Sequence, residues 1–146
     1  MKEENAHRAT IKVIEYSSIL VFSLVVLFVL VPLIQKIVYN MAWNAAMTST
    51  KETVNTVKTF YTDMNLFNEV GLPFKVVFYE DGHEFYEFGK KVSYLYELNI
   101  QNDGELPTGG SVQINKDGSA TVTDLTFGHF KCNQTNEQNL ECKREE

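Results

Sequence analysis

The stretch His83-Glu84-Phe85-Tyr86-Glu87 is the first candidate for chemistry, because His-Glu opens the helical zinc-binding pattern His-Glu-x-x-His. Glu87 occupies the position of the second histidine, and the surrounding residues have the composition of a strand, so we interpret the stretch as surface charge. His7 and His129 have no partners at ligand spacing, and neither a Gly-x-Ser-x-Gly elbow nor a phosphate-binding loop occurs. The sequence therefore predicts a protein that is not an enzyme and that has no metal site and no cofactor.

Cys132 and Cys142 are the two cysteines, with nine residues between them in the polar stretch KCNQTNEQNLECK. We predict a disulfide that closes a loop, which would contribute roughly 3 kcal/mol to a domain this small; two reduced thiols are the alternative. A bridge implies an oxidising, extracytoplasmic location. We expect the loop to lie against TFGHF (Thr126–Phe130), taken as the last strand. Asn133 opens an Asn-Gln-Thr sequon and is a candidate glycosylation site.

The segment Tyr16–Ile34 contains nineteen residues without a charge and is rich in Val, Leu, Ile and Phe. About twenty apolar residues cross a bilayer as a helix, so we predict a single membrane span within residues 11–35. A cleavable secretory signal is the alternative, although the run exceeds the usual length of about 7–15 residues and no Ala-x-Ala follows it. Basic residues only slightly favour a cytoplasmic N-terminus, with Lys2, Arg8 and Lys12 before the span and Lys36 and Lys51 after it.

Helical spacing continues beyond the apolar segment, where apolar residues recur among Asn, Thr and Lys. The residues that keep this spacing are Ile37, Met41, Ala45, Val54, Val57 and Tyr61. We therefore predict one long helix whose first half (residues 11–35) spans the membrane and whose second half (residues 36–67) is amphipathic. Gly71 and Pro73 mark the place where the chain turns after this helix.

The hydrophobic period changes to two in residues 72–146. Asp-Gly turns at Asp81-Gly82 and Asp117-Gly118 separate β-rich runs, and the stretch SYLYELNI (Ser93–Ile100) also alternates. These patterns predict three to five antiparallel strands with one apolar face, which the amphipathic half of the helix would cover. The predicted fold class is α+β, with a long N-terminal helix packed on a small antiparallel β-sheet.

Charge is divided unevenly along the chain. Residues 1–34 contain three basic and three acidic residues, so the whole net charge of −6 falls on the residues that follow. An acidic domain without a basic cluster lacks the electrostatic footprint of a protein that binds phosphate backbones. The sequence therefore predicts no intrinsic nucleic-acid site.

Glu15 and Pro32 are unexpected in a membrane-length segment, because a charge in a membrane is costly and usually marks a partner, and proline removes a helical hydrogen bond. With Ile11 counted as the first residue of a mature helix, Glu15 is fifth and Pro32 is twenty-second. This spacing resembles that of type IV pilins and pseudopilins. Ile14-Glu15-Tyr16 is similar to the start of tight-adherence pilins, and LPTGGSVQINKDGSATV (Leu106–Val122) is similar to pilin-like proteins of Gram-positive bacteria.

The resemblance implies roles for particular residues. Residues 1–10 would be a leader that a prepilin peptidase removes between Thr10 and Ile11, and Glu15 would pair with the new terminal amine of a neighbouring subunit. The leader here ends in Ala9-Thr10 rather than glycine, and Lys12 replaces a small polar residue. If the leader is retained, Lys12 or Arg8 of a neighbour would pair with Glu15 instead. Pro32 would loosen the helix near Phe28, whose carbonyl loses its helical donor.

The resemblance also implies a function. We expect a single-pass membrane protein that polymerises through its N-terminal helix into a homo-oligomeric, extracellular type IV pilus-like filament or a pseudopilus, with the pilus assembly machinery and prepilin peptidase as partners. The alternative is a single-pass membrane protein that never polymerises and presents its sheet as an extracytoplasmic ligand-binding or sensing domain. Detection of a filament would separate the two hypotheses.

Overall fold

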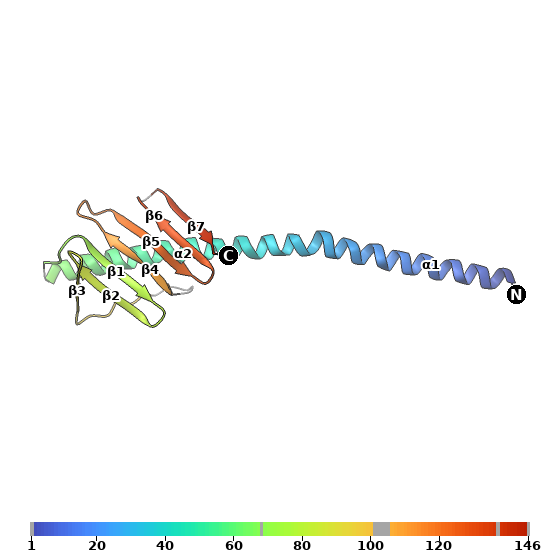
Figure 1. Cartoon of the computed structure of the whole chain (residues 1–146), viewed down its shortest axis with the longest axis horizontal. Helices are drawn as coiled ribbons and strands as arrows, with labels where there is room; N and C mark the ends of the chain where they lie inside the picture. The colour runs from blue at the N-terminus through green and yellow to red at the C-terminus, as the bar shows by residue number, and fades with distance from the viewer. Residues whose placement is uncertain (1, 68, 101–105, 137, 146) are drawn as a thin grey trace. The chain divides into compact units, whose positions relative to one another are not determined.

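The computed structural model describes residues 2–67, 69–100, 106–136 and 138–145, with side chains described from Ile11 onward. Helical residues run from Lys2 to Phe67 in three consecutive elements (Figure 1). These are α1 (Lys2–Val25), a π-helical turn η1 (Val26–Leu30) and α2 (Val31–Phe67). The strands are β1 (Phe74–Tyr79), β2 (Gly82–Glu87), β3 (Lys90–Val92), β4 (Gly109–Ile114), β5 (Ala120–Phe127), β6 (Phe130–Gln134) and β7 (Leu140–Arg144). The chain divides into two compact units, residues up to Met41 and residues from Ala42 onward.

The second unit contains a seven-stranded sheet in the order β3-β2-β1-β4-β5-β6-β7, in which neighbouring strands are antiparallel. Both Asp-Gly hairpins are present, with Tyr79 opposite Gly82 and Ile114 opposite Ala120. The α+β class, with a long N-terminal helix packed on an antiparallel sheet, is therefore confirmed. The predicted number of three to five strands was too low, because the described chain forms seven.

The alternating stretch Ser93–Ile100 is not a strand, contrary to the prediction. Tyr94 packs against Phe60 of α2, with ring centroids 5.7 Å apart, and Leu98 is buried, whereas Leu95 is 99% exposed. The segment lies beside the helix, where Glu97–Asn99 and Phe60 line the same groove. Tyr94 and Leu98 therefore bury against the core without a ladder of backbone hydrogen bonds, whereas Leu95 and Tyr96 stay exposed.

The cysteine-containing stretch is a hairpin and not the irregular loop that its polar composition predicted. Thr126–Phe130 is not the last strand, because it contains the end of β5, a turn at Gly128-His129 and the start of β6. Alternate residues of the hairpin face the core: Phe130, Cys132, Gln134 and Cys142 are all at least nine-tenths buried. Disulfide-bonded cysteines are apolar, so the hairpin buries more apolar surface than its polar amino-acid composition indicates.

The second half of the helix covers one face of the sheet with small and hydroxyl-bearing side chains. Its buried residues are Ala46, Ser49, Thr50, Thr53, Val54, Val57 and Met64. The hydroxyl groups of Thr50 and Thr53 donate to the carbonyls of Ala46 and Ser49, each at 2.8 Å, which satisfies buried polar groups within the helix itself. The predicted packing stripe is confirmed at Val54 and Val57, and the half-buried Tyr61 packs against the same core.

An aromatic cluster fills the interface between helix and sheet near the C-terminal end of α2. Phe74, which is fully buried, lies 6.2 Å from the Phe60 ring and 6.0 Å from the Phe85 ring. The Tyr94 hydroxyl donates to the Glu87 carboxylate, and that carboxylate accepts the Gly71 backbone N–H at 2.9 Å. Glu87 therefore links three segments: the turn after the helix, the second strand and the chain that follows β3.

Two tyrosines should ionise late in the folded protein. Burial, followed by the Glu87 carboxylate, raises the pKa of Tyr94, and the hydrogen bond to Glu84 raises the pKa of Tyr86 to about 12. Because their folded-state pKa values are raised, both phenols stabilise the fold below about pH 10, the ordinary tyrosine pKa, and this stability is lost as pH rises through the folded-state values. We expect Tyr94→Phe to reduce the tyrosinate absorbance step that comes above the ordinary tyrosine pKa of about 10.

The matched control for this titration is Tyr96→Phe, which removes an exposed tyrosine two residues away. It should leave the late step unchanged. A late step of equal amplitude in wild type and Tyr94→Phe would show that the bond between Tyr94 and Glu87 does not hold the phenol protonated.

Candidate assembly helix and its anchorage

The apolar part of the helix is uncovered in the described chain. One helix, Ile11–Phe67, is long and apolar enough to cross a membrane, and its most apolar window has no buried residue. Phe22 is 70% exposed and Phe28 is 74% exposed. A core helix of this chain would be mostly buried, so the exposed surface needs lipid or another protein as its cover. The predicted membrane-length helix is confirmed in length and character.

Lys12 and Glu15 lie on neighbouring positions of α1, three residues apart, so both side chains project from one face of the helix. Exposed apolar residues surround them, among them Ile11, Ile14 and Tyr16. No ion pair joins Lys12 to Glu15 within the described residues. The bond between Thr10 and Ile11, the candidate cleavage position, lies inside α1. The roles assigned to these residues stay predictions.

The helix is irregular directly before Pro32. In η1 the Val31 N–H donates to the Val26 carbonyl, which is five residues earlier and gives the wider π-helical spacing. Pro32 has no N–H, so the Phe28 carbonyl has no α-helical donor one turn later. A π-helical turn is one way in which a helix accommodates such an interruption. The irregularity therefore falls in the region where the sequence predicts loosening, and the described backbone stays helical through it.

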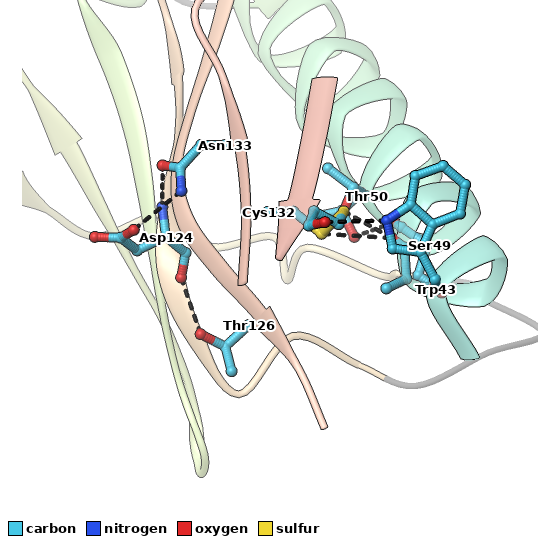
Figure 2. Close-up of a disulfide and its surroundings, with 10 residues drawn as sticks. Trp43, Ser49, Thr50, Asp124, Thr126, Cys132 and Asn133 are labelled. Carbon is cyan, nitrogen blue, oxygen red and sulfur yellow. Dashed lines mark hydrogen bonds between the residues drawn. A yellow bond between two sulfur atoms is a disulfide. The ribbon is translucent and has the colours of Figure 1, made fainter. Parts of the chain in front are cut away.

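The disulfide between Cys132 and Cys142 joins directly opposite residues of β6 and β7 beneath the start of the packed helix. Figure 2 shows Trp43 beside the bridged strands. The Trp43 indole Nε1–H donates to the Cys142 carbonyl at 3.0 Å, and the Cys132 sulfur lies 3.9 Å from the Ala46 carbonyl. The bridged hairpin is therefore the surface on which the first turns of the packed helix are fixed.

Sequence reasoning did not identify Trp43 as part of this anchorage. The available signal was that the chain has one tryptophan, placed in a helical stretch that is otherwise rich in Ala, Asn and Met. A tryptophan combines a large apolar ring with a single N–H donor, so a partly buried one usually finds an acceptor. The acceptor here comes from 99 residues later in the chain, which spacing alone could not predict.

Asn133, the candidate glycosylation residue, has a structural role in the described chain. Its amide nitrogen donates to the Asp124 carboxylate at 3.1 Å, and its amide oxygen accepts the Asp124 backbone N–H at 2.9 Å (Figure 2). Asp124 has a positive φ of 49°, and the pairing of β5 with β6 shifts between Val122 and Leu125. The side chain of Asn133 thus holds a β-bulge in β5, and its glycosylation stays a prediction.

Gly110 belongs to the same irregular region of the sheet. Its φ is +86°, and a Cβ at this position would lie 2.2 Å from the Asp124 carbonyl oxygen. Any other residue would therefore force β4 away from β5 at this bulge.

His83 and Glu84, which open the zinc-like pattern, are consecutive residues of β2 and so point to opposite faces of the sheet. His83 packs edge-on against Phe85, with ring centroids 5.0 Å apart, and burial lowers its pKa. Glu84 accepts hydrogen bonds from Tyr86 and Lys91, and the bond from Lys91 is the main cause of its lowered pKa. Among the described residues, no group of three or more His, Cys, Asp or Glu could hold a metal ion.

Removing the disulfide should weaken the domain. We expect Cys132→Ser to lower the free energy of unfolding by about 2–5 kcal/mol, because both sulfurs are buried and the bridge limits the unfolded hairpin. Unfolding of the full chain in detergent micelles can be followed through the fluorescence of Trp43, the single tryptophan. Lys143→Ser, at an exposed position of β7, is the control and should change stability by about 0.5 kcal/mol or less. Equal stability of the two variants would show that the disulfide does not stabilise the domain.

Restoring a donor at Pro32 should regularise the helix. We expect Pro32→Ala to slow amide hydrogen exchange around Val26–Val31 by up to about a hundredfold, because an interior helical proline costs about 3 kcal/mol. Leu33→Ala is the control, since it changes a neighbouring residue without adding an N–H. Indistinguishable exchange in wild type and Pro32→Ala would mean that the π-helical turn does not depend on the proline.

The comparisons with known proteins leave the family of this chain open. No family model, no curated protein and no solved structure matches the chain. Its architecture, a long apolar N-terminal helix with an antiparallel sheet and a disulfide, is compatible with a pilin-like fold.

Proposed function

We propose that this chain is a structural, pilin-like subunit that is made as a single-pass membrane protein and polymerises through its N-terminal helix into an extracellular filament or a pseudopilus. The observation that carries this proposal is a membrane-length helix with no buried residue in its apolar window and a carboxylate near its start. Lipid can cover such a helix in a monomer. Equivalent helices of neighbouring subunits can cover it after polymerisation.

Two features favour helix packing between subunits over a simple anchor. Glu15 stands just before nineteen uncharged residues, and a carboxylate in that position is more costly in lipid than beside an opposite charge. Pro32 closely follows an irregular turn inside the same segment, which a passive anchor does not need. Both residues stand where the resemblance to type IV pilins assigns a register-setting glutamate and a helix-loosening proline.

The packed domain would form the outer part of such an assembly. Its sheet has an apolar face covered by the helix and a second face with polar side chains, including Lys75, Gln113, Thr121 and Lys131. A single-layer sheet with one polar face is suited to contact with water. The disulfide suits an oxidising exterior, where reduction by cytosolic thiols does not occur.

The proposal requires partners outside the chain. Extraction of the helix from the bilayer needs an assembly machinery, and removal of residues 1–10 would need a prepilin peptidase. A non-polymerising membrane protein with a sensing domain is the competing function. The open groove at the edge of the helix near Phe60 does not favour it, because a ligand site usually encloses most of its ligand.

Glu15 provides the test of this proposal. Glu15→Ala should insert into membranes and fold as wild type does, since the side chain lies outside the packed domain, yet it should give few filaments. Loss of only about 1.4 kcal/mol per contact lowers an association constant about tenfold, so the loss accumulates along a polymer. The measurement is filament yield in sheared surface material by electron microscopy, with the chain identified by mass spectrometry.

Two further variants sharpen the result. Glu80→Ala, at the exposed turn between β1 and β2, removes a carboxylate from the domain and should assemble normally. Lys12→Ala should copy the Glu15→Ala defect only if the leader is retained, because a cleaved chain offers its terminal amine instead. Wild-type filament yield from Glu15→Ala would refute the role of this carboxylate.

A further inference from the structure

A polar groove lies on the face of the sheet that α2 does not cover, where β1, β4 and β5 are neighbours. Its volume of about 620 Å³ falls within the range of about 300–1,000 Å³ that is usual for ligand sites. Gly109 and Gly110, at the start of β4, have no side chains, which leaves a hollow between the side chains of β1 and β5. The lining residues come from these strands and from the segments that flank them.

Tyr79 provides an exposed aromatic ring at one side of this groove. It is the last residue of β1, and its side chain points to the opposite face from the buried Phe78. The Tyr79 hydroxyl donates to the Glu84 carboxylate at 3.4 Å, and the same carboxylate accepts the Tyr86 hydroxyl at 2.8 Å. The ring is 47% exposed and lies outside the core, so it is available to an apolar surface of a ligand.

Polar groups lie on the two strands beside Tyr79. Ser111 of β4 pairs with Val77 on one side and Thr123 on the other, and it is only 6% exposed, so it forms the floor of the groove. Asp124 of β5 lies on the far side, where its carboxylate accepts the Asn133 amide at 3.1 Å (Figure 2). That hydrogen bond orients the carboxylate, which can accept further hydrogen bonds from a ligand. Groups that are already oriented lose less entropy on binding.

The charges and the position of the groove exclude several kinds of ligand. Its charged lining residues are Lys75, Glu80 and Asp124, a mixture that does not favour a polyanion. An extended peptide adds to an unpaired sheet edge, whereas β1, β4 and β5 are each paired on both sides. An uncharged ligand that has both an apolar C–H face and several hydroxyl groups matches the ring and the polar groups together.

We propose that this groove binds a segment of an uncharged saccharide chain, with one sugar ring stacked on Tyr79 and sugar hydroxyl groups donating to the Asp124 carboxylate. The groove is open, so it holds part of a chain that continues into water and does not enclose a small molecule. The remaining hydroxyl groups of the sugar stay hydrated. This inference goes beyond the proposed function and does not depend on polymerisation, because the lining residues belong to one domain.

Saccharide binding can be measured with the full chain in phosphatidylcholine nanodiscs, since glucoside or maltoside detergents would compete for the site. Fluorescently labelled nanodiscs are applied to immobilised oligosaccharides of glucose, galactose, mannose and N-acetylglucosamine, and to sulfated oligosaccharides. We expect retention on at least one uncharged saccharide and weaker retention on the sulfated ones. Retention no greater than that of empty nanodiscs, or retention on sulfated saccharides alone, would overturn the inference.

Substitution of Tyr79 tests the aromatic side of the groove. Tyr79→Leu removes the ring and should weaken saccharide binding about tenfold, whereas Tyr79→Phe keeps the ring and should retain most of the affinity. Tyr96→Leu, at an exposed tyrosine outside the groove, is the control and should bind as wild type does. Equal affinity of wild type and Tyr79→Leu would refute the stacking on this ring.

Asp124→Asn tests the polar side. An asparagine can still accept the Asn133 amide and tolerates a positive φ, so thermal unfolding followed by Trp43 fluorescence should be unchanged. Saccharide affinity should fall about tenfold, because hydrogen bonds to a charged acceptor are the stronger ones. Asp63→Asn, at an exposed position of α2, is the control and should retain the affinity. Unchanged affinity in Asp124→Asn would overturn the assignment of the saccharide to this groove.

Discussion

The packing of one continuous helix element, α2, on one face of the sheet is the interaction on which the rest of the structure depends. The sheet is a single layer, and its inner face, with Phe74, Val76, Val112 and Leu125 fully buried, has no other long cover among the described residues. The same element begins at Val31, within the apolar segment. The chain therefore has a single helix with two different apolar surfaces. The sheet covers one of them, and the other needs a cover from outside the chain.

The two ends of this packed helix are held by different chemistry. Toward the turn that follows the helix, aromatic rings of Phe60, Phe74 and Phe85 stack, and Glu87 ties the surrounding segments together. At the other end, small residues lie on the disulfide-bonded hairpin, and Trp43 donates to its backbone. The second arrangement leaves little bulk beside the helix, which is why a groove lined by alanines remains open there.

The elements set by local chemistry could be predicted from the sequence, and the features set by distant contacts could not. Asp81-Gly82 and Asp117-Gly118 identified two hairpins, and the Val54 and Val57 spacing identified the buried face of the helix. Ser93–Ile100 alternates but buries only part of its apolar residues, among them Leu98, and forms no strand. The polar composition of KCNQTNEQNLECK does not reveal a strand pair that buries its cysteines. The pairing of Asn133 with Asp124 and the groove beside Ala45 depend on register between strands and helix, which the sequence does not display.

In the proposed filament, the exposed apolar helix of each copy is covered by the equivalent helices of other copies. Electron cryomicroscopy of filaments sheared from cells that express this chain tests that claim most directly. We expect a filament in which residues 11–41 form a bundle of helices along the axis, surrounded by the sheet domains. Absence of this chain from every surface filament, with the intact protein recovered only from the membrane fraction, would contradict this expectation and favour a non-polymerising membrane protein.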